Sequence, residues 1–159
     1  HGCVVTYTHG GGRIGVIVEA DTDVVNDAVK ECLTNVAMQV AALAPKYVAV
    51  DDVPEEYKEH EKQILIAQAQ NDPKNASKPA NIIEKMITGR LAKELKEVCL
   101  LEQAYVKDGD LTVGKYVEQV GKETGANLSI KRFVRFETGE GIEKKVDDFA
   151  AEVAAQAGL

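Results

Sequence analysis

The chain has 159 residues, 45% of them hydrophobic and 28% charged, a composition typical of one soluble domain with a core of its own. Its net charge of −7 argues against nucleic acid as a direct partner, because phosphate binding needs clustered lysine and arginine. No apolar run approaches the length of a membrane span, so a membrane is not an expected partner. Three widely spaced cysteines match no metal-binding pattern, and we expect neither metal nor cofactor. Because the chain opens at His1 inside an expected strand, without an initiator methionine, we expect a fragment or a processed product.

The first predicted element is a β-hairpin, although its glycines also have the spacing of a dinucleotide-binding loop. The G-x-G-x-x-G spacing is formed by Gly10, Gly12 and Gly15. A phosphate-binding loop of that kind must be followed by a helix, whose N-terminal N–H groups hold the phosphate. Residues 14–18 are instead mostly β-branched and alternate in pattern, which predicts a strand. We therefore predict strands over Cys3–Thr8 and Arg13–Ala20 around a turn at His9–Gly12, and not a nucleotide-binding enzyme.

A long amphipathic helix should follow the hairpin. Residues 21–23 offer an N-cap, and the helix must end before Pro45, because the residue ahead of a proline leaves the α region. Its expected apolar face consists of Val25, Val29, Cys32, Leu33, Val36, Val40 and Leu43.

The next two predicted helices should form an antiparallel hairpin. Pro54 suits the first position of a helix, and the acidic residues around it favour the positive end of the helix dipole. This helix runs to about Asn71 and is too highly charged to be buried on all sides. After a polar turn, Pro79 opens a second helix with apolar residues nearly four apart. We expect the pair to project from the body and to meet solvent or another copy of the chain.

The chain then returns to the body of the domain. We expect an irregular segment at 102–110 that exposes Tyr105 and Val106, followed by a short helix over Thr112–Glu123. An exposed apolar pair of this kind is a plausible anchor for a partner.

A third strand is expected over Asn127–Glu137. Its alternation slips around Arg132 and Phe133, which predicts a bulge or an edge position. A last helix, over Ile142–Gln156, should close the chain. The predicted fold class is α+β: a three-stranded antiparallel sheet packed against helices, with an inserted, protruding antiparallel helical hairpin.

No catalytic constellation is visible in the sequence. Ser77 and Ser129 lack the context of a nucleophile elbow, and His60 lies on a charged helix face. The residues alone therefore predict an acidic interaction domain without identifying its partner.

Six segments, in order and over essentially the whole chain, resemble translation elongation factor Ts. They are "HGGGRIGVIVE", "VAMQVAALAPKYV", "DDVPEE", "IIEKMITGRLAKELKEVCLLEQAYVKD", "TVGKYV" and "RFVRFETGEGIEKKVDDFAAEVAAQ". The resemblance implies a guanine nucleotide exchange factor, not an enzyme, that binds elongation factor Tu and promotes release of GDP. It also implies a homodimer, in a bacterial cytoplasm or inside an organelle. The implied domains of this carboxy-terminal half are a core subdomain (1–53 and 98–141), a dimerisation hairpin (54–97) and a carboxy-terminal helical module (142–159).

The resemblance further assigns partner-binding roles to individual residues. They are His9, Gly10 and Arg13 at the hairpin tip, Tyr105, Val106 and Lys107 in the irregular segment, and Phe149 and Val153 in the closing helix. Each group also has a plainer interpretation. The glycine serves the turn, the tyrosine covers the edge of the sheet, and the closing helix packs on its own body.

One motif departs from the family pattern. The family's Thr-Asp-Phe-Val motif wedges its phenylalanine into the GTPase near the magnesium site, whereas this chain carries Thr22, Asp23 and Val24 at that point. Either the copy is degenerate, or the working motif lies in a missing preceding subdomain. We favour the second, because it also explains the start at His1. The alternative function is then a non-catalytic dimerisation and docking fragment whose exchange wedge lies in missing sequence.

Overall fold

The computed structural model describes residues 2–139. In chain order, the elements are β1 (Gly2–His9), β2 (Ile14–Asp21), α1 (Asp27–Leu43), α2 (Glu55–Asn71), α3 (Ala80–Val98), β3 (Ala104–Tyr105), β4 (Asp108–Thr112), α4 (Val113–Thr124) and β5 (Ser129–Glu137). Short 3-10 turns occupy Val50–Asp52, Pro73–Asn75 and Leu100–Glu102. The helix expected over Ile142–Gln156, with Phe149 and Val153, lies outside the described residues.

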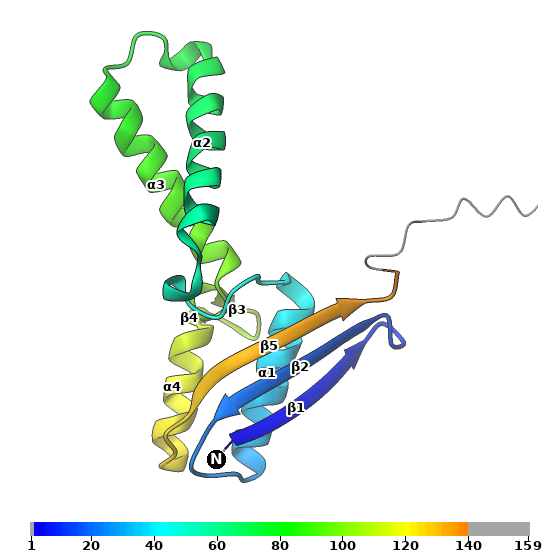
Figure 1. Cartoon of the computed structure of the whole chain (residues 1–159). Coiled ribbons are helices and arrows are strands. Elements are labelled where there is room, and N and C mark those ends of the chain that lie inside the picture. The colour runs from blue at the N-terminus through cyan, green and yellow to red at the C-terminus, as the bar shows by residue number, and fades with distance from the viewer. Residues whose placement is uncertain (1, 140–159) are drawn as a thin grey trace, which may run out of the picture.

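Strands β1, β2 and β5 form one antiparallel sheet with β2 in the centre, as Figure 1 shows, which confirms the predicted α+β fold. The pairing of β2 with β5 shifts register between Glu19 and Ala20, which leaves Lys131 as an extra residue in β5. This β-bulge lies next to the point where the alternation of the sequence slips. Strand β5 is also an edge strand, so both readings of the slip hold.

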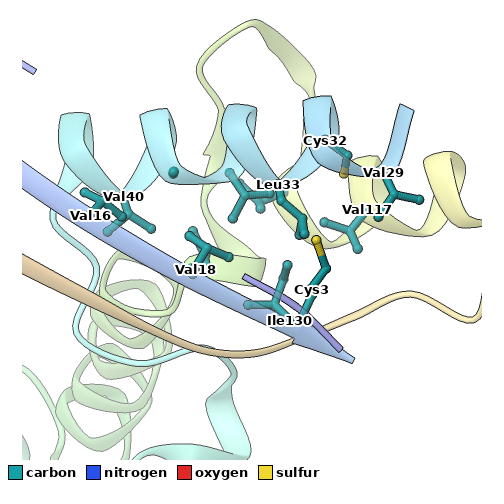
Figure 2. Close-up of a cluster of buried hydrophobic side chains, with 14 of the residues drawn as sticks. Cys3, Val16, Val18, Val29, Cys32, Leu33, Val40, Val117 and Ile130 are labelled. Carbon is teal, nitrogen blue, oxygen red and sulfur yellow. The ribbon is translucent and has the colours of Figure 1, made fainter. Parts of the chain in front are cut away.

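Helix α1 covers one face of the sheet and builds the core with it (Figure 2). Alternate residues of β2 are buried on this face, because successive side chains of a strand point to opposite sides. The core side chains labelled in Figure 2 are Cys3, Val16, Val18, Val29, Cys32, Leu33, Val40, Val117 and Ile130. The predicted apolar face of the helix is therefore confirmed along its centre.

The prediction is wrong at both ends of this apolar face. Thr22 does not cap the helix, because its hydroxyl bonds to the backbone two residues further on, at 2.7 Å from the carbonyl oxygen. The N-cap is Asn26, whose side chain accepts from the Val29 N–H at 2.9 Å. Val25 therefore precedes the helix and is exposed, and Leu43 in the last turn is exposed as well.

Helices α2 and α3 form the predicted hairpin, which projects away from the sheet (Figure 1). Leu65, Ala69 and Ile87 make a small buried cluster between the two helices. At the far end, the Asn75 side chain donates to the carbonyl of Ala69 at 3.0 Å and closes the turn. The hairpin therefore has its own small core, separate from that of the sheet.

The base of the hairpin is tied to the body by Tyr47. This residue forms a parallel bridge with Cys99, so the chain entering the hairpin lies beside the chain leaving it. The rings of Tyr47 and Tyr57 meet edge to face at 5.4 Å between centroids, and Lys46 Nζ lies 5.3 Å from the centroid of Tyr57. These contacts join the segment before α2 to α2 itself and to the end of α3.

The segment predicted to be irregular instead forms a second small sheet. Strands β3 and β4 pair antiparallel and are joined by a turn at residues 106–107. Helix α4 follows at once, with Thr112 as its N-cap and Gly125 in the left-handed conformation at its C-terminus. The sequence does not reveal β3 because a strand of two residues is too short to show alternation.

Candidate partner-docking site

The turn between β1 and β2 presents the predicted hairpin tip to solvent. The three glycines at positions 10–12 have φ angles of 62°, 69° and 90°, which L side chains rarely adopt. His9 and Arg13 flank them and are exposed. The hydroxyl of Tyr7 lies 3.0 Å from His9 Nδ1 and supports the imidazole. The glycine run is thus explained by the backbone of the turn, which holds a histidine and an arginine outward.

Gly15, the third glycine of the dinucleotide spacing, lies inside β2 and not at the start of a helix. It faces Phe136 across the β2–β5 pairing, and a Cβ at Gly15 would lie 2.2 Å from Cε2 of that ring. The strand predicted after the glycines is therefore confirmed. The glycine spacing therefore has two separate causes: the tight turn requires Gly10 and Gly12, and the contact with the Phe136 ring requires Gly15. Residues 14–21 form a strand, so no helix N-terminus follows the glycines.

The prediction that Tyr105 is exposed is wrong. Its side chain is 4% exposed, and its ring stacks on Tyr116 of α4 with centroids 4.3 Å apart and planes 11° apart. Burial, and then the hydrogen bond with Tyr116, raise the pKa of Tyr105 far above its usual value. This tyrosine therefore packs within its own domain, against α4.

The two residues that follow Tyr105 do face outward. Val106 is 50% exposed at the turn between β3 and β4. Lys107 is exposed, and its Nζ donates to Oδ1 of Asn35 at 2.6 Å. The turn therefore presents the apolar side chain of Val106 beside the ammonium group of Lys107, which is hydrogen-bonded to Asn35 of α1.

Two polar residues of α1 support this turn and were not among the predicted site residues. Gln39 is fully buried, and its amide bonds to the backbone of Ala104 and Val106. Asn35 bonds to Lys107 and also donates to a tyrosine hydroxyl of α4. The sequence does contain a signal for them, because Asn35 and Gln39 lie four residues apart on an otherwise apolar face of the helix. A buried amide there is costly unless it finds a hydrogen-bond partner.

The segment that matches the family's exchange motif ties β2 to the start of β5. Oδ1 of Asp23 accepts from the Asn127 N–H at 2.8 Å, and Oδ2 accepts from the Asn127 side chain at 2.9 Å. Thr22 is buried and Val24 is half-buried. The aspartate is thus engaged within the chain, and the valine offers no ring to a partner.

The structure does not bring the predicted docking groups together. The β1–β2 tip and the β3–β4 turn lie apart, on either side of α1 (Figure 1). The third group, Phe149 and Val153, falls outside the described residues. A partner that touched both the tip and the turn would therefore have to reach across the domain.

Within residues 2–139, the side chains assemble no group of three histidine, cysteine or acidic residues that could hold a metal ion. Cys32 lies in the core, where burial raises the pKa of its thiol to about 11, so the thiol is protonated and unreactive near neutral pH. No helix in this part of the chain is long and apolar enough to cross a membrane.

The described residues thus form a small sheet backed by helices, with exposed turns and a projecting helical hairpin. The sequence model for elongation factor Ts matches residues 1–140. Elongation factor Ts of Clostridioides difficile is 53% identical over 156 residues, which cover 98% of this chain. Its counterpart in Carboxydothermus hydrogenoformans is 52% identical over 158 residues and 97% of this chain. The chain belongs to the elongation factor Ts family of translation elongation factors, as the resemblance implies.

The chain spans only part of these relatives. It covers 50% of the length of the Clostridioides difficile protein and 51% of that from Clostridium botulinum strain Eklund 17B. It covers 71% of the Carboxydothermus hydrogenoformans protein.

Proposed function

We propose that this chain is part of a guanine nucleotide exchange factor that binds elongation factor Tu and promotes release of its GDP. The observation that carries the proposal is the identity of 53% and 52% to two proteins named elongation factor Ts, over nearly the whole chain. Such a factor is not an enzyme in the usual sense, because it changes how tightly the partner holds its nucleotide and no covalent bond is made or broken. The organisms of these relatives favour a bacterial cytoplasm as the compartment.

We assign the docking contacts to the β1–β2 tip and the β3–β4 turn. Arg13 at the tip suits a charged contact, and the exposed Val106 suits an apolar one. His9 and Lys107 lie beside them as further polar groups. Tyr105 supports the turn from within, because its ring is buried against α4.

Exchange requires more than docking. A GTPase holds GDP through contacts to phosphate and magnesium, so a factor speeds release only by favouring a state in which those contacts are disturbed. The relevant quantity is the coupling free energy between binding of the factor and binding of the nucleotide. The segment 22–24 carries a half-buried valine where the family wedge carries phenylalanine, and this favours docking with weak exchange by this chain alone.

The second candidate function is a docking and dimerisation module that leaves exchange to sequence outside this chain. The hairpin is where we place self-association, with a second copy of the chain as the partner. Ile64 and Ile82 are about 40% exposed on it, so apolar surface remains uncovered. A shallow groove between α2 and α3 adds to this surface, and it is lined by Lys62, Ile66, Ala80, Ile83, Glu84, Ile87 and Thr88. The domain division at residues 54–97 and 142–159 stays a prediction within this proposal.

The docking assignment is tested by calorimetric titration of the chain against nucleotide-free elongation factor Tu. Arg13→Glu should weaken binding by about tenfold, because a reversed charge at a contact is repelled by the group that it used to meet. Lys122→Glu is the matched control, an equal charge reversal on the exposed face of α4, and should leave the affinity within about twofold. Equal losses in both variants would mean that net charge matters and the tip does not.

A further inference from the structure

We propose that Gln39 and Asn35 of α1 are positioning residues, whose side-chain amides hold the turn at residues 104–107 in the shape that docks on the partner. The inference rests on the proposed function, because it concerns how one docking surface is prepared. It adds two residues to that surface, and neither of them would touch the partner.

Gln39 uses both ends of its amide on this turn. Its Nε2 donates to the carbonyl of Ala104 at 3.0 Å, and its Oε1 accepts from the N–H of Val106 at 2.9 Å. The side chain is 0% exposed and lies on the apolar face of α1. Burying an amide is costly unless it is hydrogen-bonded, and the turn supplies the bonds that offset the cost.

A second buried amide extends this support to the helical hairpin. Nε2 of Gln39 lies 3.3 Å from Oε1 of Gln103, and Nε2 of Gln103 donates to the carbonyl of Glu97 at 2.7 Å. The backbone carbonyl of Gln103 also accepts from the first N–H of α4 at 3.0 Å. The end of α3, the middle of α1 and the start of α4 are thus joined behind the turn.

Asn35 holds the other side of the turn. Its Oδ1 accepts from Nζ of Lys107 at 2.6 Å, and its Nδ2 donates to the hydroxyl of Tyr116 at 2.9 Å. The ring of Tyr116 in turn stacks on Tyr105. Each residue of the turn is therefore fixed by its backbone or its side chain, while the side chain of Val106 is left 50% exposed.

This arrangement matters for binding because a flexible turn must lose conformational entropy when it docks. A turn that is already fixed in the folded chain pays less of that cost on binding. The role predicts that Gln39 affects affinity only through the turn that it holds. A purely structural role predicts that affinity follows overall stability instead.

The test is a double-mutant cycle on binding to nucleotide-free elongation factor Tu. Gln39→Met and Val106→Ser should each weaken binding by about tenfold, and the double variant should lose about tenfold, not the hundredfold of independent effects. Val29→Ala, a buried change ten residues earlier in α1, should lower the melting temperature and leave the affinity unchanged. Additive losses, or wild-type affinity in Gln39→Met, would overturn the inference.

A second measurement uses the chain alone and does not depend on the partner. Amide hydrogen exchange at Val106 should speed up at least about tenfold in Gln39→Met, relative to exchange at the core residue Leu33. In Val29→Ala the ratio of the two rates should stay as in the parent. If the methionine variant fails to fold, Gln39→Glu at mildly acidic pH is the second variant, because its buried carboxyl is then protonated. One oxygen still accepts from Val106 and the O–H can donate to the carbonyl of Ala104, so the slow exchange should be preserved. An unchanged ratio in Gln39→Met or fast exchange in Gln39→Glu overturns the positioning role, whereas failure of the parent to bind overturns only the proposed function.

Discussion

At the scale of single residues, Gly15 and Phe136 share one space on the outer face of the sheet. The ring lies where a β-carbon of residue 15 would be, so the glycine is required by its neighbour and not by a ligand. Phe136 is itself 51% exposed, and its ring can turn toward solvent if it is pushed. The cost of filling the site is therefore moderate.

Gly15→Ala should lower the free energy of unfolding by about 1 kcal/mol, at the low end for an overpacked site, because the displaced ring loses its contact with β2. Gly89→Ala is the matched control. Gly89 lies inside α3 with no atom within 4 Å of the added carbon, so the change should stabilise the chain by about 0.5–1 kcal/mol. Urea unfolding of both variants measures the difference. A Gly15→Ala variant as stable as the parent would contradict the ring contact.

Glu94 provides a pH dependence that can be measured. Burial, and then repulsion from Glu61 on the facing helix, raise the pKa of this carboxyl above its usual value. The folded state therefore binds the proton more tightly than the unfolded chain does. The contribution of Glu94 to stability is unfavourable above its folded pKa and improves as the pH falls through that value.

Glu94→Gln should accordingly be more stable than the parent at pH 7. The difference should shrink as the pH falls and vanish well below about pH 4, where the carboxyl is protonated in the unfolded chain as well. Thermal unfolding across this range gives the comparison, with Glu84→Gln on the same helix as a control. A difference that grows toward low pH would show that the sign is wrong.

At the scale of elements, the sequence predicts those helices and strands that form through interactions between residues close together in the chain. The strand after Gly12, the two helices of the hairpin and α4 follow from alternation, from proline at the start of a helix and from helical spacing. Helix α1 begins later than the capping residues at 21–23 predict. Thr22 bonds within a turn of its own, and three capping residues in a row do not decide between a turn and a helix start. The burial of Tyr105 does not follow from its local sequence, because its stacking partner, Tyr116, comes from a later helix. The roles of the buried amides Asn35 and Gln39 likewise do not follow from the local sequence, because their hydrogen-bond partners lie in a turn at residues 104–107.

The hairpin should act as the dimerisation element. Deleting residues 55–94 should convert a self-associating chain into a monomer, because the exposed isoleucines of α2 and α3 are removed with it. Sedimentation velocity measures both proteins over a range of concentration. If parent and deletion variant sediment as identical monomers, the hairpin does not mediate association.

At the scale of the whole molecule, the chain should bind no nucleotide of its own. The glycines at 10–12 are followed by strand β2, so no helix N-terminus is present there to bind a phosphate. Equilibrium dialysis with GDP should show no saturation up to high micromolar concentration. Saturable binding at micromolar GDP would contradict this account of the hairpin.

The central claim is that this chain docks on elongation factor Tu better than it drives exchange. Val24 is shorter than the family's phenylalanine and lacks a ring, which should cost about 1–3 kcal/mol of coupling free energy, roughly 5- to 150-fold in the coupling between factor binding and nucleotide binding. The tip and the β3–β4 turn are intact, so binding should survive. Val24→Phe should raise the rate of release only if this segment is the working wedge.

The most direct test measures the rate at which elongation factor Tu releases mantGDP, a fluorescent form of GDP. The chain is present at a concentration that saturates its binding to elongation factor Tu. We expect release well below that produced by a full-length member of the family under the same conditions. Release equal to that of the full-length factor would contradict the claim, because segment 22–24 would then be sufficient as it stands or irrelevant to exchange.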